Sequence, residues 1–214
     1  MATVPHDTAI AWARSARKPR GEGHSRRAEI LVAAERIFVE HGYEGATIRK
    51  IADEVGLSST ALYIHFADKE AILQEICRTA FETLIATNRD ILEATSAPEE
   101  RLRRMLAAYV EFGFANPNAY RLIYLTRPLE ARDGAETAAQ NLGAELFGSF
   151  ADVVEQVAIA GRLRTDAKVA AQVFWAGVHG IVSLIITKPY FPWADRDALV
   201  QTMSDALFEG LLTS

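Results

Sequence analysis

Side chains able to contact a polyanion are concentrated in the stretch TIRKIADEVGLSSTALYIHFADK, residues 47–69. Arginine and lysine pair with phosphate groups, and hydroxyl groups donate to, or accept from, the edges of nucleic-acid bases. Small residues beside them let a helix backbone lie close to the floor of a DNA groove. The stretch therefore favours nucleic-acid binding, and the side chains concerned are Thr47, Arg49, Ser59, Thr60, Ala61, Tyr63, His65 and Lys69.

Two short helices must position these side chains. The first is predicted to begin after Thr47, a suitable N-cap, and to end at Gly56, which is free to take the positive φ of a tight turn. The second begins after Ser58, another N-cap residue. Two short helices joined in this way form a helix-turn-helix, whose second helix enters the major groove of DNA. This arrangement presents residues 59–61 to base edges.

Each of these side chains also has an interpretation that needs no DNA. The hydroxyl run could serve only as a helix cap, Tyr63 could be a half-buried core aromatic, and His65 a packed histidine. Lys69 lies in the first turn of the next helix, where the helix dipole disfavours a cation unless an anion is near. It could equally be a solvated charge. The joint occurrence of these residues in one short span favours the DNA-binding interpretation.

Helical periodicity covers almost the whole chain after residue 24, and no stretch is a convincing strand. A first helix is expected from Ser25 to Gly42. The predicted fold is all-α, with an N-terminal three-helix helix-turn-helix unit and a C-terminal helical bundle. The predicted units are an arm (1–24), a DNA-binding domain (25–70) and the bundle (71–214). Further helices are expected from Asp68, after Pro98, within 117–128, near 134–160, over 166–187, and from about Asp195 to Leu211.

Charge is distributed unevenly along the chain, whose net charge is −5. Residues 1–70 carry ten basic and ten acidic side chains, whereas the remaining residues carry thirteen basic and eighteen acidic ones. The acidic excess therefore lies in the C-terminal part. The first 24 residues are predicted to form a flexible basic arm. This arm is either a solvated tail or a segment that follows DNA phosphates or a minor groove.

The composition is that of an ordinary globular protein, with half of its residues hydrophobic. The single cysteine, Cys77, excludes an intrachain disulfide and favours a reducing compartment, and we expect it to pack in a helix core. No apolar run is expected to reach the roughly 18 residues that span a membrane, and the N-terminus lacks the apolar region of a secretory signal. We therefore predict a cytoplasmic protein without membrane contact.

Catalytic patterns are not evident. The sequence shows no metal-spaced His/Cys cluster, glycine-rich phosphate loop or Ser/His/Asp arrangement, so no enzyme activity, metal or cofactor is predicted. The main alternative is an all-α enzyme or carrier with an incidental helix-turn-helix, whose turnover would survive loss of the Tyr63 and Lys69 side chains. A further alternative is a DNA-binding architectural protein, whose DNA affinity no small molecule would change.

Residues 26–73, RRAEILVAAERIFVEHGYEGATIRKIADEVGLSSTALYIHFADKEAIL, resemble the DNA-binding domain of TetR-type transcriptional regulators. The match rests on a glycine–aromatic turn, then TIRKIA, GLS and LYIHF followed by DKE. The resemblance implies a dimeric regulator, most often a repressor, whose C-terminal helices bind an effector. Ile64 departs from the polar or aromatic residue often found there. The implied roles are sugar–phosphate contacts for Thr47, Tyr63, His65 and Lys69, and base contacts for Arg49, Ser59, Thr60 and Ala61.

The segments ANPNAYRLIY and FWAGVHGIVSL resemble a Trp-x-x-x-His-Gly type of C-terminal ligand-binding domain, a match carried by Trp175, His179 and Gly180. It implies a pocket for a small, partly apolar effector within 71–214. These aromatics could also be ordinary core, and His179 could be a packed, hydrogen-bonded histidine. The candidate pocket residues are Tyr109, Phe112, Tyr124, Phe147, Phe150, Trp175 and His179.

The last two long helices are the predicted homodimer surface. Gly177 and Gly180 permit close helix approach, and the segment 169–186 is too apolar to be left in water. A two-fold dimer implies a palindromic double-stranded operator with half-sites about 34 Å apart, or a multiple of that spacing. The effector would bind best when the spacing of the two DNA-binding domains does not fit the operator. The helix that begins near Lys69 would link the effector pocket to the DNA-binding domain.

Overall fold

The computed structural model describes residues 23–125 and 138–213. Within these ranges all regular structure is helical, apart from one isolated bridge between Leu163 and Leu212, so the all-α prediction is confirmed. The predicted arm lies outside these ranges except for its last two residues, which already belong to the first helix. The helices are α1 (Gly23–Gly45), α2 (Ile48–Glu54), α3 (Ser59–Tyr63), α4 (Lys69–Ala94), α5 (Pro98–Ala115), α6 (Pro117–Tyr120), the π-helical turn η1 (Arg121–Leu125), α7 (Ala138–Ile159), α8 (Ala167–Thr187) and α9 (Arg196–Leu211).

Local hydrogen bonds define the ends of the short N-terminal helices. The Thr47 hydroxyl accepts from the Lys50 amide at 3.2 Å, and the Ser58 hydroxyl accepts from the Ala61 amide at 3.1 Å. Both N-cap predictions are therefore confirmed. Gly56 has φ 66°, which the turn between α2 and α3 requires. Gly42 has φ 68°, so α1 is interrupted where the sequence predicted its end, although helical structure resumes as far as Gly45.

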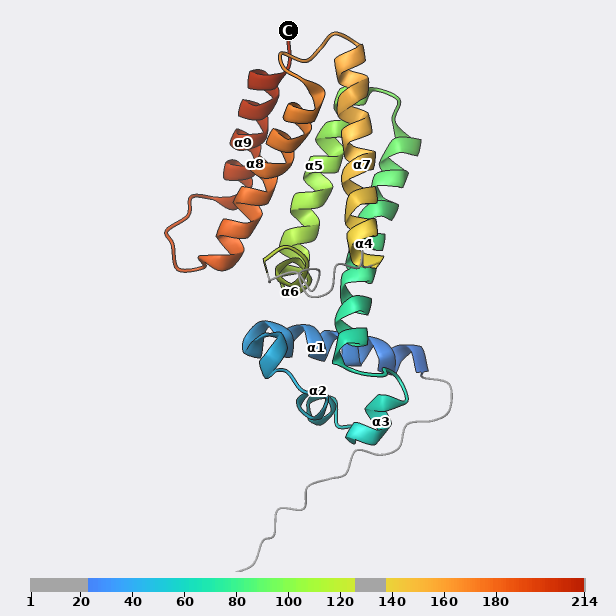
Figure 1. Ribbon diagram of the computed structural model, residues 1–214. Coiled ribbons are helices and arrows are strands. Elements are labelled where there is room, and N and C mark those ends of the chain that lie inside the picture. Colours follow the sequence, from blue (N-terminus) through green and yellow to red (C-terminus); the bar gives the residue numbers. More distant parts are fainter. Residues whose placement is uncertain (1–22, 126–137, 214) are drawn as a thin grey trace, which may run out of the picture.

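The N-terminal helices share one apolar core. In Figure 1, α1 crosses between the bundle and the pair α2 and α3. The predicted boundary at residue 70 falls in the first turn of α4, yet α4 contributes buried residues as far as Cys77 to this core. Leu122 of η1, which follows α4 and α5 in the sequence, is also buried in this core. The N-terminal unit is thus completed by two segments that the sequence assigned to the bundle.

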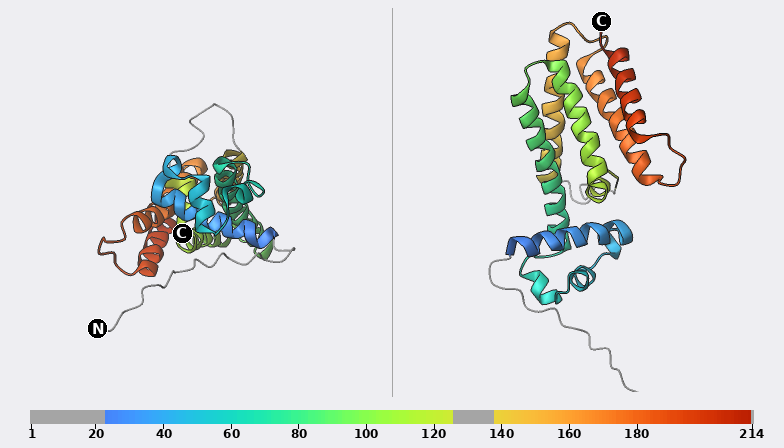
Figure 2. Two further views of the ribbon diagram at one scale, coloured as in Figure 1. Left: turned by 90° about the horizontal axis from the view of Figure 1, so that it is seen from below. Right: turned by 180° about the vertical axis from the view of Figure 1, so that it is seen from behind.

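The C-terminal bundle is built from α4, α5, α7, α8 and α9. Figures 1 and 2 both show α4 running from the N-terminal helices into this bundle, while α6 lies at its lower end. Its core is a continuous cluster that includes the fully buried residues Leu102, Tyr120 and Phe174. One helix therefore spans both units, and α6 with η1 occupies the space between them.

Helix α8 is long and apolar enough to cross a membrane by length and composition, with a mean hydropathy of 1.8, where the sequence analysis expected no such run. It packs against α5, α7 and α9. Its buried face includes Phe174 and Val178, and buried helices of globular proteins meet the same composition test. Its other face leaves Val169, Val173 and Leu184 exposed.

Candidate functional site

The helix-turn-helix lies at the end of the molecule farthest from the bundle (Figure 1). Here the Arg49 side chain is 85% exposed, and its only described ion pair is with Asp53 at 3.8 Å. Thr60 is exposed, and Tyr63 and Ile64 are 55% and 81% exposed. Together α2, α3 and the residue after α3 thus expose an arginine, a hydroxyl, an aromatic ring and an isoleucine.

The remaining residues of this surface are held more firmly. Ser59 and Ala61 are half-buried, as expected for the first turn of a helix that packs on α2. His65 is half-buried, and its carbonyl oxygen accepts a hydrogen bond from Arg27 Nη1 at 2.6 Å. The Arg27 guanidinium also lies 4.1 Å from the centre of the Phe66 ring. α1 thus fixes the end of α3 through Arg27, which the sequence analysis did not single out.

Lys69 has internal partners. Its Nζ donates to the carbonyl oxygens of Tyr43 at 2.8 Å and Ala46 at 3.3 Å, and it lies 4.2 Å from the centre of the Tyr43 ring. Its side chain is 26% exposed. The alternative of a freely solvated charge is therefore wrong. The carbonyl groups at the C-terminal end of α1 supply the negative partner that a lysine at a helix N-terminus needs, and a DNA contact by Lys69 stays a prediction.

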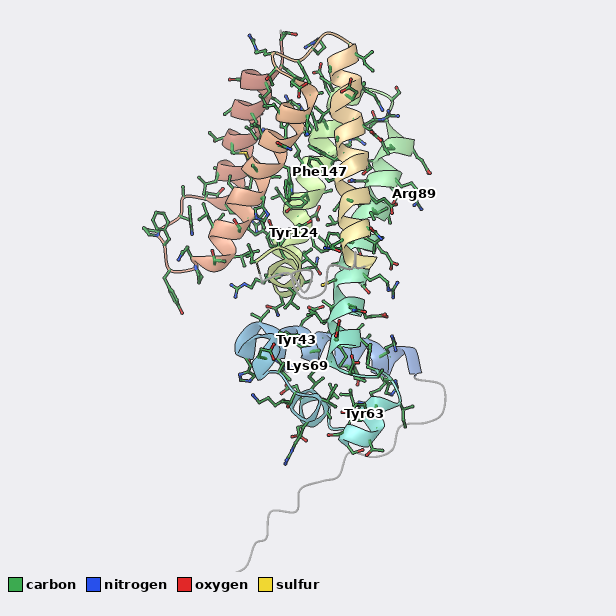
Figure 3. The ribbon with its side chains drawn as sticks, in the orientation of Figure 1. Tyr43, Tyr63, Lys69, Arg89, Tyr124 and Phe147 are labelled. Atoms are coloured by element: carbon green, nitrogen blue, oxygen red, sulfur yellow. The ribbon has the colours of Figure 1, made fainter. Side chains whose placement is uncertain are left out.

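A cavity of about 300 Å³ lies inside the bundle between α4, α5, α7, α8 and η1. Figure 3 shows Tyr124 and Phe147 within this part of the bundle. Five of the seven residues predicted to form a pocket line the cavity: Tyr109, Tyr124, Phe147, Phe150 and Trp175. The other described lining residues are Phe81, Leu84, Asn88, Met105, Ile123, Gln140, Gly143 and Leu146.

The two other predicted pocket residues do not line the cavity. Phe112 packs against the bundle core. His179 lies behind the wall, where its Nδ1 is 2.7 Å from the Tyr120 hydroxyl and 3.1 Å from the Tyr109 hydroxyl. The two hydroxyls are 3.1 Å apart. His179 is therefore a hydrogen-bonded histidine, and contact between it and an effector stays a prediction.

Burial keeps this polar network neutral. Burial raises the pKa of Tyr109, Tyr120 and Tyr124 far above the ordinary tyrosine value, and it lowers the pKa of His179. Three phenols and a neutral imidazole therefore face one another near pH 7. Such a group can orient a ligand by hydrogen bonds, but it supplies no charge.

Three polar residues of the site were missed by the sequence analysis, one of which is Gln140, a lining residue of the cavity. Tyr120 is fully buried and joins Tyr109 to His179. Asn88 lines the cavity and is only 7% exposed, and its amide donates to the Ser149 hydroxyl at 3.2 Å. Asn88 lies at helical spacing from Phe81 and Leu84, so a polar residue within the apolar stripe of α4 was the available signal.

The described residues contain no group of three or more His, Cys, Asp or Glu side chains that could hold a metal ion. Two candidate sites stand on other observations: a cavity whose described walls carry no charged side chain, and an exposed helix-turn-helix surface.

Comparison with known proteins identifies both parts of the chain. A family model described as "Bacterial regulatory proteins, tetR family" matches residues 30–76, and one described as "Tetracyclin repressor-like, C-terminal domain" matches residues 102–207. The solved structure of the ketosteroid transcriptional regulator KstR2 of Mycobacterium tuberculosis is similar, with a TM-score of 0.73 and 26% identity over 88% of this chain and 96% of that chain.

Two curated relatives come from the H37Rv strain of Mycobacterium tuberculosis. The HTH-type transcriptional repressor KstR2 is 42% identical over 91 residues, which cover 42% of this chain and 46% of that protein. The HTH-type transcriptional repressor Rv1474c is 32% identical over 143 residues, which cover 66% of this chain and 71% of that protein. The match to KstR2 thus spans about half of its length. The Trp-x-x-x-His-Gly subgroup stays a prediction.

Proposed function

This chain belongs to the TetR family of bacterial regulatory proteins, and we propose that it is a transcriptional repressor released from DNA by a small effector. Its family and its relatives are DNA-binding regulators rather than enzymes. In this proposal the protein acts in the cytoplasm, binds a palindromic operator as a dimer and has no membrane contact. The observation that carries the proposal is the combination of two features in one molecule. The helix-turn-helix is exposed, and the bundle, which has a core of its own, contains a cavity.

The chemistry of the helix-turn-helix surface supports contact with DNA. The Arg49 side chain on α2 is 85% exposed, and a surface ion pair such as Arg49–Asp53 is easily exchanged for a phosphate or a guanine. Thr60 and Tyr63 lie about one turn apart on the neighbouring helix, α3, and both are exposed. We assign base contacts to Arg49, Ser59, Thr60 and Ala61, and backbone contacts to Thr47, Tyr63, His65 and Lys69.

The segment η1 supports coupling between cavity and DNA-binding unit. Leu122 is buried in the N-terminal core, and its neighbour Ile123 both packs against that core and lines the cavity. The next residue, Tyr124, lines the cavity as well. An effector that moves Ile123 or Tyr124 therefore acts within two residues of Leu122 in the N-terminal core. It would release DNA by binding best to the arrangement of the two domains that does not fit the operator.

The exposed stripe of α8 supports dimerisation. Val169, Val173 and Leu184 recur at helical spacing and are 48%, 38% and 48% exposed in the protomer. A row of large apolar side chains on one helix face marks an interface rather than a solvated surface. We propose that α8 and α9 pack against their copies about a two-fold axis, which would set the distance between the two DNA-binding domains.

The proposed function is tested by selecting bound sequences from a random duplex pool. The full chain is compared with an Arg49→Ala, Tyr63→Ala variant, in which both substituted side chains are exposed, so that folding is preserved. Arg104→Ala is the matched control, because Arg104 is also exposed and also forms an i,i+4 ion pair, with Glu100, but lies on α5 of the bundle.

The expected result is one palindromic motif, enriched by the parent protein and by Arg104→Ala and lost in the double variant. Enrichment without two-fold symmetry would contradict the dimer, and equal enrichment by the double variant would contradict the assigned surface. No enrichment, even after the protein has been unfolded and refolded to remove any bound effector, would contradict DNA binding itself. Transcription in vitro from a promoter carrying the motif then shows whether the protein represses.

A further inference from the structure

The walls of the cavity contain no charged side chain among the residues that the structure describes. Their polar groups come from Asn88, Tyr109, Tyr124 and Gln140, and the remaining lining residues are apolar or aromatic. A buried ionised group without a partner charge is strongly disfavoured in such surroundings. We propose that the effector is an uncharged, largely apolar molecule that carries a hydroxyl or carbonyl group. The proposal rests on the function proposed above.

The phenol network supplies the hydrogen-bonding partner for the polar group of the effector. A neutral imidazole offers one hydrogen-bonding position at Nδ1, and the nearer hydroxyl, that of Tyr120 at 2.7 Å, occupies it. The Tyr109 hydroxyl, which lies 3.1 Å from that of Tyr120, is then engaged by Tyr120. Tyr120 and His179 lie behind the wall, whereas Tyr109 and Tyr124 line the cavity. Tyr120 and His179 therefore orient the Tyr109 hydroxyl, and Tyr124 is the member of the network that is left to bond the effector.

Tyr124 can serve either a donor or an acceptor. Its hydroxyl interacts with that of Tyr109, and burial keeps it protonated by raising its pKa. If it donates to Tyr109, its oxygen accepts from a hydroxyl of the effector, and if it rotates, it donates to a carbonyl. A carboxylate would accept the same hydrogen bond, but its charge would have no cationic partner among the described walls. The site therefore selects against an ionised effector by desolvation.

The size of the cavity limits the effector further. Its volume of about 300 Å³ is twice that of an engineered apolar cavity of ~150 Å³ that binds benzene. A molecule of roughly two fused rings is therefore a suitable probe. The aromatic side chains Phe81, Phe147 and Trp175 line the cavity and favour flat rings, because ring pairs add to the free energy of area burial.

Three two-ring probes test the proposal: 2-naphthol, 2-naphthoate and naphthalene. Binding to the full chain is measured without DNA, by ligand fluorescence and by calorimetry at pH 7. We expect 2-naphthol to bind about tenfold or more tightly than 2-naphthoate, because only the second must bury a charge. Equal or tighter binding of 2-naphthoate, or no saturable binding of 2-naphthol, would overturn the proposal.

Three variants locate the binding. Tyr124→Phe keeps the ring and should weaken 2-naphthol about three- to tenfold while leaving naphthalene unchanged. Gly143→Leu should abolish binding of all three probes, because Gly143 lines the cavity and a Cβ there would already lie 3.4 Å from the Phe81 ring. Gly148→Leu on the same helix is its control, since a Cβ at Gly148 meets nothing within 4 Å.

Unchanged 2-naphthol binding in both Tyr124→Phe and Gly143→Leu would overturn the assignment of this cavity. The outcome is separate from that of the operator selection. If the probes bind but no operator does, the proposed class of uncharged effectors stands and the repressor function is wrong. If an operator binds but 2-naphthoate is preferred, the repressor function stands and the proposed effector class is wrong.

Discussion

The Nζ atom of Lys69 lies 2.8 Å from the carbonyl oxygen of Tyr43 and 4.2 Å from the centre of the Tyr43 ring (Figure 3). The first residue of α4 is thereby joined to the interrupted end of α1. Helix α4 then continues into the bundle, where Leu84 and Asn88 line the cavity. A lysine that the family resemblance assigns to DNA is therefore also part of the contact between α1 and the start of α4.

Lys69→Met should lower the free energy of unfolding as well as operator affinity. The substitution removes hydrogen bonds from a cation to two carbonyl groups, so we expect a loss of about 1–3 kcal/mol. Arg49→Ala removes an exposed side chain and should change stability by less than about 0.5 kcal/mol while weakening operator binding. Urea unfolding compares the two. If Lys69→Met unfolds at the same urea concentration as the parent protein, the contact between Lys69 and the end of α1 is energetically unimportant.

Gly113→Ala should destabilise the bundle. A Cβ at this position would lie 2.5 Å from Val182 Cγ1 and 3.1 Å from the Tyr120 ring, so α5 and α8 would have to separate. Overpacking of this kind costs about 1–3 kcal/mol. Gly148→Ala is the comparison, because a Cβ there meets nothing within 4 Å and alanine stabilises a helix interior by roughly 0.5–1 kcal/mol. Thermal unfolding should therefore shift in opposite directions, and a shift in the same direction would contradict the close approach of α5 and α8.

Acidification should weaken the bundle through His179. Burial lowers the pKa of folded His179 below the ordinary histidine value of 6.5, so the unfolded chain binds the extra proton first. The contribution of neutral His179 to stability is complete above pH 6.5 and is lost as the pH falls through the lower folded pKa.

His179→Gln isolates this effect, since glutamine stays neutral and retains an oxygen acceptor for the Tyr120 hydroxyl. Urea titrations at pH 7 and pH 5 should show that the stability advantage of the parent protein over the variant is smaller at pH 5. A constant difference between the two proteins would show that folded His179 titrates normally.

Val173→Lys should separate the proposed dimer. Val173 lies in the exposed stripe of α8, and a lysine there would bury a charge against the partner, which should raise the dimer dissociation constant about a hundredfold or more. Val32→Lys is the control, because Val32 is 68% exposed but lies on α1. Sedimentation velocity measures the fractions of monomer and dimer in each variant. A dimer that persists in Val173→Lys would exclude α8 from the interface.

The local elements of this protein follow from residues that are close in sequence. The hydroxyls of Thr47 and Ser58 cap α2 and α3 through amides three residues away, and Gly56 supplies the positive φ of the turn between them. Caps, turns and apolar stripes involve short-range sterics and hydrogen bonds, so their residue types predict them. The all-α fold and the helix-turn-helix could be predicted for that reason, whereas the aromatic residues of the cavity wall were named from the resemblance to a TetR-type ligand-binding domain.

Long-range packing decided the rest. Tyr120 and His179 meet across 59 residues, Asn88 and Ser149 across 61, and Lys69 and Tyr43 across 26. A single sequence states which of these side chains are polar but not which of them face one another, because that depends on how α4, α5, α7 and α8 pack. The sequence by itself determined the helices and the kind of surface they carry. Only the tertiary structure decided that Lys69 closes the end of α1, that His179 stands behind the cavity wall and that Asn88 faces its interior.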